Sequence, residues 1–570
     1  MVGWNSEAQN IESIINQNPL IINGNIQFDQ MFIPNNNENG KWYTYYLSGQ
    51  LNSQIYGISL PITFNYSNQD FGFKHPFTFN QFGAQPEYKW LKLIVGYNSV
   101  NYSPFTLNGH QINGIGFEIK PNKIPIMFSA IYGRLLKAID YSDTNNTIPS
   151  YKRMGGGIKL STTLKNISAS TSIFYAHDNT ASILPPPDSL GITPKENLSY
   201  NLQGNIQITK RLTFDFDLGN SILTDDITSP KENKQKFLGN LYTYRTSTSS
   251  SWAYKGNLNY NINIGSLGIG YERIAPNFRT LGAYYNTNDY ENYTANITIS
   301  LFKGRLNMAY TGGLQRDNLE KQKVLSNRRF VNSTNISSNL SDKINFSLNY
   351  STFNSFTNAR SVFDEINANS PYANLDTLNF TQINRSGTAN LNYLFGSESN
   401  PQSISTSINI NQSISKNDNN SQEGDMIMLN GSINHSININ KSWVLVASLF
   451  YSRYNIEDGV NSTIGPLYSI TKIIKDKRLK AGLASTINKS WINDKAQSTN
   501  YNIRLNGNWE FYKGHQVNIS AGYLYLKPHT TGLKERSSLT INISYNYQFN
   551  SVLLKRKDKQ QTDETAKNSL

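Results

Sequence analysis

Histidines are the first residues to consider for catalysis or metal binding, and here they lie far apart. The chain has six of them: His75, His110, His177, His435, His515 and His529. No two have the close spacing that a metal site requires. The sequence also lacks a G-x-S-x-G elbow, an H-E-x-x-H pair, a Walker loop and any cysteine. We therefore expect no catalytic residue, no metal and no cofactor, and we predict that the protein is not an enzyme.

Acidic residues suggest a second kind of chemistry, the attraction of ions. Asp418, Glu423 and Asp425 gather in or beside a polar stretch. They lack the spacing and central glycine of a calcium loop, which indicates a solvated cluster. Asp215 and Asp217 lie where polar and apolar residues alternate, so in a strand both carboxylates share one face. We predict that this pair faces a lumen and would tune the passage of ions.

Alternation of apolar and polar residues is the dominant pattern of the chain. Near the C-terminus the apolar set is Leu539, Ile541, Ile543, Tyr545, Tyr547 and Phe549. The residues between them are Thr540, Asn542, Ser544, Asn546 and Gln548. Such a run matches the roughly 9–11 residues that a tilted strand needs to cross a bilayer. One face of the strand suits lipid and the other suits water.

The composition fits strands that are apolar on one face only. Of 570 residues, 38% are hydrophobic and 16% are charged, and the mean hydropathy is −0.50. No apolar run approaches the length of a transmembrane helix, but a transmembrane β-barrel is polar on average because only alternate residues contact lipid. The net charge of +13 is spread along the chain without a basic helix or arm, so we expect no nucleic-acid partner.

Short and long connections take turns between the alternating segments. Short turns fall near Lys165-Asn166 and Lys303-Gly304, and longer polar stretches run from Asn179 to Pro194 and from Thr357 to Asp376. Outer-membrane barrels have short periplasmic turns and longer outer loops. The alternating segments are longer than the strands of an Asn-rich β-solenoid or of a string of soluble β-sandwiches, and no fixed motif period appears. Both observations argue against these two alternatives.

These patterns predict an all-β fold, a transmembrane antiparallel up-and-down β-barrel of about 26 strands, within a range of 24–26. An even number of strands places both termini in the periplasm. The expected segments are a short periplasmic stretch at 1–23, a single barrel at 24–549 and a charged periplasmic tail at 550–570. The first twenty residues lack the basic start and apolar run of a signal peptide, so we expect an export signal that this sequence does not contain.

The first quarter of the chain resembles a known family. The residues that carry the resemblance are Phe79-Asn80-Gln81-Phe82-Gly83, Tyr88-Lys89-Trp90, Gly96-Tyr97, Tyr102 to His110 and Tyr132-Gly133-Arg134. They resemble a family of large outer-membrane β-barrel proteins of the Bacteroidota, most of which have no assigned function. The resemblance implies an integral outer-membrane location and no enzymatic activity.

A barrel this wide would leak unless its lumen were filled. Only about twenty residues precede the first predicted strand near Gly24, too few for the plug domain of a TonB-dependent transporter. We expect the two long loops, the basic tail or a partner to fill the lumen. The residues expected to anchor the loops are Ile183, Leu184, Val362, Phe363 and Ile366. Ser103-Pro104-Phe105 is interpreted as a structural turn, with an inward-folding loop as the alternative.

The predicted function is transport, or export and assembly, across the outer membrane, as a subunit of a larger complex. The alternative is a stand-alone porin-like channel for solutes. The expected partners are outer-membrane lipids, lipopolysaccharide, and proteins of the outer membrane or periplasm.

Overall fold

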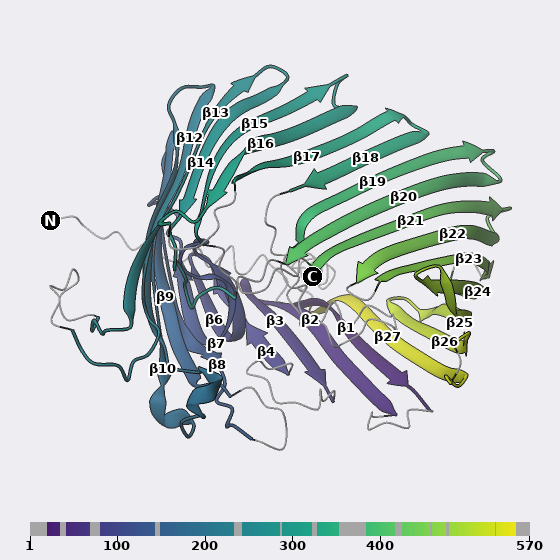
Figure 1. Ribbon diagram of the computed structural model, residues 1–570, viewed down its shortest axis with the longest axis horizontal. Helices are drawn as coiled ribbons and strands as arrows, with labels where there is room; N and C mark the ends of the chain where they lie inside the picture. Colours follow the sequence, from purple (N-terminus) through teal and green to yellow (C-terminus); the bar gives the residue numbers. More distant parts are fainter. Residues whose placement is uncertain are drawn as a thin grey trace, which may run out of the picture.

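The strands of this protein form one antiparallel sheet of 27 segments (Figure 1). The computed structural model describes residues 20–34, 42–68, 80–142, 149–232, 242–284, 288–321, 328–352, 383–415, 424–456, 459–474, 478–530 and 532–554. The first third of the sheet comprises β1 (Leu20–Phe32), β2 (Tyr43–Ile55), β3 (Ile58–Ser67), β4 (Gln81–Ala84), β5 (Glu87–Tyr88), β6 (Leu91–Asn101), β7 (Asn108–Ile119), β8 (Ile126–Leu136) and β9 (Lys152–Thr163). The middle third comprises β10 (Ile167–Asn179), β11 (Glu196–Gln207), β12 (Leu212–Thr224), β13 (Thr248–Ile262), β14 (Gly265–Ile274), β15 (Tyr290–Leu301), β16 (Leu306–Asp317), β17 (Arg328–Ser341) and β18 (Ile344–Ser351). The last third comprises β19 (Ile383–Gly396), β20 (Pro401–Ser415), β21 (Gly424–Ile439), β22 (Trp443–Ile456), β23 (Gly459–Ile474), β24 (Leu479–Ile492), β25 (Lys495–Tyr512), β26 (His515–Pro528) and β27 (Arg536–Leu554).

The 27 segments make 26 strands of the barrel wall, because β4 and β5 are two pieces of one strand. Both pieces pair with β3 on one side and with β6 on the other. The break falls at Gln85-Pro86, where proline cannot donate a ladder hydrogen bond.

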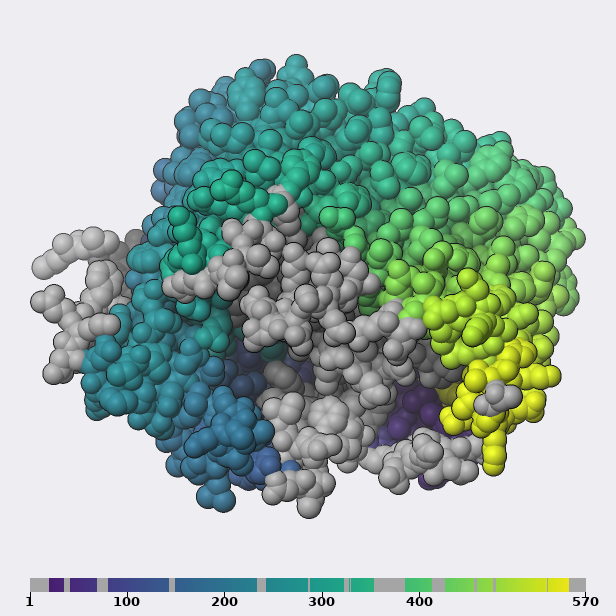
Figure 2. All heavy atoms as spheres, viewed as in Figure 1, coloured from purple at the N-terminus to yellow at the C-terminus, as the bar shows by residue number. Residues whose placement is uncertain are grey.

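The wall is closed by pairing between the first and last strands. β1 runs antiparallel to β27, from Leu20 opposite Leu554 to Phe32 opposite Ile541. Every other wall strand pairs with its neighbours in sequence. Figure 2 shows the two ends of the colour scale, purple and yellow, meeting side by side. The prediction of a transmembrane up-and-down barrel of about 26 strands is confirmed.

Alternation along each strand separates an apolar outer face from a polar inner face. On β14 to β16, for example, Ile269, Tyr293 and Leu314 are exposed on the outer face. On β12 the exposed Leu218 follows Asp217, which hydrogen-bonds to a loop on the lumen side. Outer residues of this kind form the apolar band that contacts lipid in transmembrane barrels.

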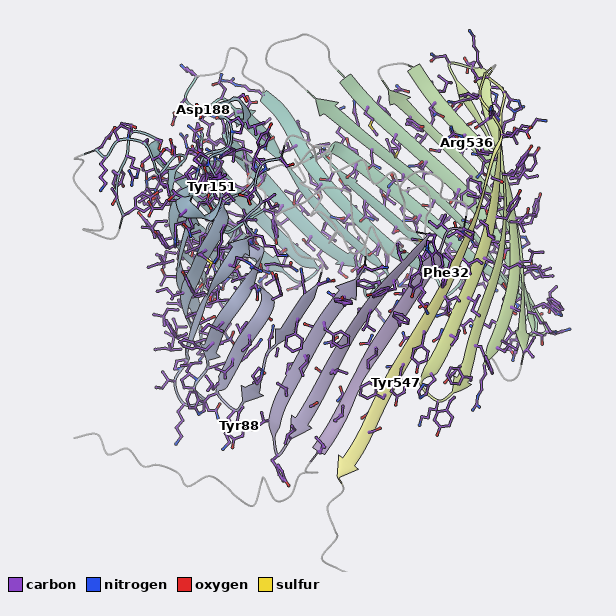
Figure 3. The ribbon with its side chains drawn as sticks, turned by 90° about the horizontal axis from the view of Figure 1, so that it is seen from below. Phe32, Tyr88, Tyr151, Asp188, Arg536 and Tyr547 are labelled. Atoms are coloured by element: carbon purple, nitrogen blue, oxygen red, sulfur yellow. The ribbon has the colours of Figure 1, made fainter. Side chains whose placement is uncertain are left out.

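The two rims of the barrel carry connections of different length. Two-residue or slightly longer turns, such as Lys513-Gly514, join strands at the rim where β1 begins and β27 ends. Figure 3 shows Tyr88 near this rim, and Asp188 and Arg536 near the opposite one. The opposite rim carries the longer connections, among them residues 180–195 with two 3₁₀ turns, η1 (Thr180–Ser182) and η2 (Asp188–Leu190). Some later connections on this rim are short, such as Asn493-Asp494 between β24 and β25.

Buried apolar residues gather where connections fold back on the wall. Two clusters lie on the inner face, around Phe174 and around Phe105. A third lies on the outer face, where Tyr242 of the β12–β13 connection packs on Leu198 and Ile222. Among the described residues, no helix is long and apolar enough to cross a membrane.

Candidate functional site

Two connections fold onto the lumen side of the wall between β6 and β14. The first inward loop, residues 102–107, joins β6 to β7. The second inward loop, residues 275–284, belongs to the connection from β14 to β15. Together with the inner face beneath them, they form the candidate functional site.

Hydroxyl groups hold the first inward loop to the wall. Ser103 Oγ donates to Asp217 Oδ2 on β12 at 2.9 Å, and Thr106 Oγ1 lies 2.8 Å from Ser172 Oγ on β10. Thr106 and Ser172 are fully buried, and Ser103 is nearly so. Because buried hydroxyls are costly unless bonded, these contacts fix the loop in one position.

Tyr102 begins the first inward loop and is bonded through both its backbone and its ring. Its carbonyl oxygen accepts hydrogen bonds from Lys159 Nζ at 2.9 Å and from Gln203 Nε2 at 3.2 Å. Its hydroxyl lies 2.9 Å from Ser129 Oγ. Burial raises the pKa of the Tyr102 phenol above its usual value.

The side chain of Phe105, at the tip of the first inward loop, packs on Gly219 of β12, where a larger residue would collide with it. A β-carbon added to Gly219 of β12 would lie 2.5 Å from Phe105 Cβ. The Phe105 ring also packs edge-on against Phe278 of the second inward loop, with ring centroids 5.6 Å apart. Ala253 and Ile274 complete this buried cluster. The two loops therefore share one apolar contact on the wall.

Hydrogen bonds that involve backbone groups join the second inward loop to the first inward loop and to the strands beside it. Thr280 Oγ1 donates to the carbonyl of Thr106 at 2.8 Å, and the amide of Asn108 donates to the carbonyl of Gly282 at 2.9 Å. The amide of Leu281 donates to Asn197 Oδ1 on β11 at 3.0 Å. The loops thus form one layer rather than two separate flaps.

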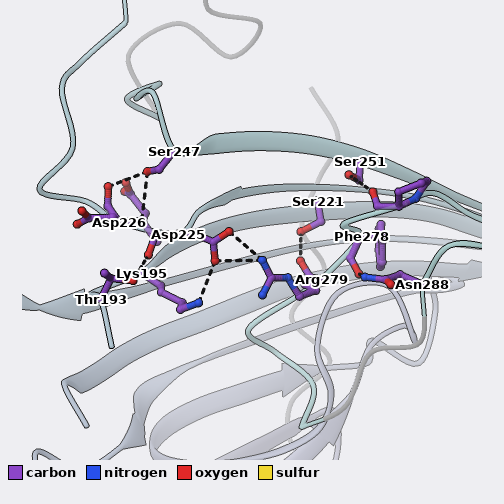
Figure 4. Close-up of polar contacts among 12 residues, drawn as sticks. Thr193, Lys195, Ser221, Asp225, Asp226, Ser247, Ser251, Phe278, Arg279 and Asn288 are labelled. Atoms are coloured by element: carbon purple, nitrogen blue, oxygen red, sulfur yellow. Dashed lines mark hydrogen bonds and ion pairs between the residues drawn. The ribbon is translucent and has the colours of Figure 1, made fainter. Parts of the chain in front are cut away.

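An ionic cluster lies beside this layer at the rim of the long connections (Figure 4). The guanidinium of Arg279 donates to both oxygens of Asp225, at 3.1 and 2.8 Å. Lys195 Nζ reaches the same carboxylate at 2.9 Å. Asp225 therefore connects the second inward loop to the connections that follow β10 and β12.

A polar pocket of about 370 Å³ opens on the inner wall beside the first inward loop. It is lined by inward-facing residues of β8 to β13, including Lys159, Gln203, Asp215, Asp217 and Lys255. Asp217 lies opposite Lys255 in the β12–β13 register, and charges of both signs therefore face the lumen here.

The structure places the two predicted lumen acids in this pocket. Asp215 accepts hydrogen bonds from Asn205 at 2.5 Å and Asn259 at 3.2 Å. Asp217 accepts from Ser103 and Asn201. These carboxylates are thus held in place by amides and a hydroxyl on neighbouring elements.

The predicted loop anchors have different surroundings. Ile183 is 6% exposed, whereas Leu184 of the same connection is 81% exposed. Val362, Phe363 and Ile366 lie outside the described residues, as do Asp418 and Glu423 and the tail beyond Leu554.

The sequence allows two interpretations of the first inward loop and does not indicate the second inward loop. Ser103-Pro104-Phe105 admitted both a structural turn and an inward loop, and the structure has the loop on the lumen wall. Nothing singled out residues 275–284, because their partners lie on strands far away in sequence. Within the described part of the chain, no three His, Cys, Asp or Glu residues are grouped to hold a metal ion.

No protein-family model and no curated protein sequence matches the chain. Solved outer-membrane barrels are similar to it. The translocation pore of the P pilus usher PapC matches over 93% of this chain and 99% of its own, with 9% identity and a TM-score of 0.41. The copper transporter OprC matches over 93% and 80%, with 11% identity and a TM-score of 0.36. The FrpB iron transporter from Neisseria meningitidis matches over 92% and 82%, with 10% identity and a TM-score of 0.37. Likenesses this distant carry no inference about cargo, and the assignment of the fold rests on the strand pairing itself.

Proposed function

We propose that the protein is a non-enzymatic, integral outer-membrane barrel that serves the passage of hydrophilic material, as a subunit of an export or assembly complex. The observation that carries the proposal is a closed wall with an apolar outer face and a polar inner face. Barrels of about 16–18 strands already enclose an aqueous channel. A wall of 26 strands encloses a wider one.

The charges on the inner wall favour cargo that is polar but of no fixed sign. Asp217, Lys255 and Glu272 occupy facing positions on three successive strands, β12 to β14. Such alternation of sign gives no large field of one polarity. Lys255 is exposed on this face of the wall, so its charge faces material in the lumen.

The proposed location rests on the same features of the wall, and the proposed lineage rests on the resemblance of residues 79–134. A closed barrel with an apolar outer face and long connections on one rim is typical of the bacterial outer membrane. We infer as well that the chain belongs with the large Bacteroidota barrels that residues 79–134 resemble.

Conductance of the purified protein in planar bilayers tests the proposal. We expect ion conductance, and we expect Lys255→Glu to shift the reversal potential toward cation selectivity, because it replaces a lumen cation with an anion. Lys489→Glu on the outer face of β24 is the matched control and should leave selectivity unchanged. Selectivity that ignores both changes would argue against an open path along this wall.

The stand-alone channel and the complex subunit differ in what co-purifies. Purification in mild detergent followed by mass spectrometry should return fixed partner chains if the protein is a subunit. Recovery of the barrel alone, conducting at full level, would favour the stand-alone channel.

A further inference from the structure

A row of charged side chains crosses the outer face of four adjacent strands, β14 to β17. The strand register sets Arg273 opposite Glu291, Glu291 opposite Arg316, and Arg316 opposite Arg328. Each residue lies at or next to the strand end that meets the long-connection rim. Figure 1 shows the four strands side by side in the wall. Since neighbouring strands are about 4.8 Å apart, the row is on the order of 15 Å wide.

An apolar row lies two residues nearer the middle of the same strands. It consists of Tyr271, Tyr293, Leu314 and Phe330, which the register also sets opposite one another. All four side chains are exposed, between 36% and 65%. Over two residues along each strand, the outer face therefore changes from an apolar row to a cationic row nearer the rim. A membrane changes in the same order, from acyl chains to head groups.

Glu291 holds the centre of the charged row in place. Its side chain is 3% exposed and accepts hydrogen bonds from the hydroxyls of Tyr271 and Tyr293, both at 2.8 Å. Its second oxygen accepts from Arg316 Nε. The Arg316 side chain is still 48% exposed, and its terminal nitrogens make no hydrogen bond with a described residue. Glu291 thus orients this guanidinium and leaves its outer edge available.

Among the described residues, the other two guanidinium groups have no carboxylate as an ion-pair partner. Arg273 and Arg328 make no hydrogen bond or ion pair with any residue that the structure describes. Three arginines against one glutamate leave the row with a net positive charge of two. Arginine is weakly hydrated and binds phosphate in a bidentate manner, so closely spaced arginines at a membrane surface favour phosphorylated ligands.

We propose that this row binds the phosphate groups of a phosphorylated glycolipid in the outer leaflet, with its acyl chains on the apolar row. The two features complement the two halves of one such lipid, a negatively charged head and an apolar tail. The proposal rests on the outer-membrane location proposed above. It is independent of what passes through the lumen, because the row lies on the opposite face of the wall.

Lipid binding by the purified full chain in neutral detergent tests the inference. The probes are bis-phosphorylated lipid A, the same lipid A with its phosphates removed, and inorganic phosphate. We expect the phosphorylated lipid to bind roughly tenfold more tightly than the dephosphorylated one, as one or two charge-assisted hydrogen bonds would give. Millimolar inorganic phosphate should not displace it, because the apolar row contributes as well. Equal binding of the two lipids to the unmodified protein would overturn the inference without any mutation, and displacement by phosphate alone would overturn the lipid as its ligand.

Substitutions in the charged row test whether it causes the preference for the phosphorylated lipid. Replacing Arg273, Arg316 and Arg328 by glutamine should abolish the preference for the phosphorylated lipid. The matched control replaces Lys303, Arg305 and Lys441 by glutamine at the turns of the opposite rim and should keep the preference. If the triple variant does not fold, Arg328→Gln alone should reduce the preference, because this exposed side chain has no described partner. A folded variant that still prefers the phosphorylated lipid to the same extent would contradict the proposal.

Conductance separates this inference from the proposed function. Channels formed by the triple variant should conduct like the unmodified protein. Loss of lipid preference with normal conductance supports both proposals. An unmodified protein that conducts but does not distinguish the two lipids would leave the channel standing and remove the lipid site.

Discussion

The alternation of apolar and polar residues in the sequence predicts which face of the barrel each side chain occupies. It does not predict contacts between residues that are far apart in the sequence. Alternation with Phe214, Phe216 and Leu218 puts Asp215 and Asp217 on one face of β12. It does not reveal the partner of Asp217, Ser103, which lies 114 positions away. The face that a side chain occupies is set by its own strand, whereas its contacts are set by which strands and loops the barrel brings together.

Gly219 provides a residue-scale prediction. Gly219→Ala should displace Phe105 and destabilise the first inward loop by about 1–3 kcal/mol, the usual effect of overpacking. The reason is the 2.5 Å separation between the added β-carbon and Phe105 Cβ. Gly522→Ala is the matched control, since Gly522 of β26 has nothing within 4 Å of its added β-carbon. Urea unfolding in detergent, followed by gel mobility, measures both, and equal stability of the two variants would contradict the close contact.

At the scale of elements, the sequence predicts where the strands lie but not where the inward loops contact the wall. The run from Leu539 to Phe549 lies within β27, because period-two alternation is a local property of a strand with one face in lipid. The inward loops are different. Residues 275–284 carry no pattern of their own, and their position depends on Phe105, Asn197 and Asp225 on other elements. Residues 81–88 also escape a simple strand pattern, because Pro86 divides that strand in two.

The shared apolar contact between the inward loops predicts how they come apart. Phe278 is 2% exposed and packs on Phe105, so Phe278→Ala should release the second inward loop from the wall. Trypsin should then cut more readily after Arg279, which follows it in the same loop. Phe302→Ala removes an exposed phenylalanine from a turn and should change neither cleavage nor folding. Cleavage after Arg279 at the same rate in all three proteins would show that Phe278 does not hold the loop.

The whole molecule was the most predictable level. A count of alternating segments gave about 26 strands, and closure of β27 on β1 makes a wall of that number. The count succeeds because each crossing repeats the same local pattern and the same kind of connection. It carries no information on which strands the inward loops cover, since every strand looks alike at that level.

Orientation in the membrane is the property of the whole molecule that one experiment can fix. Leu184 lies in the long connection after β10 and is exposed, and Lys303 is exposed in the short turn between β15 and β16 on the opposite rim. The chain has no cysteine, so Leu184→Cys and Lys303→Cys each create a single thiol without background. Long connections face outward in bacterial outer-membrane barrels. A membrane-impermeant maleimide should therefore label Leu184→Cys on intact cells, and Lys303→Cys only after the outer membrane is opened. The reverse pattern would invert the barrel, placing the arginine row of β14 to β17 at the periplasmic surface and removing its proposed access to outer-leaflet glycolipid.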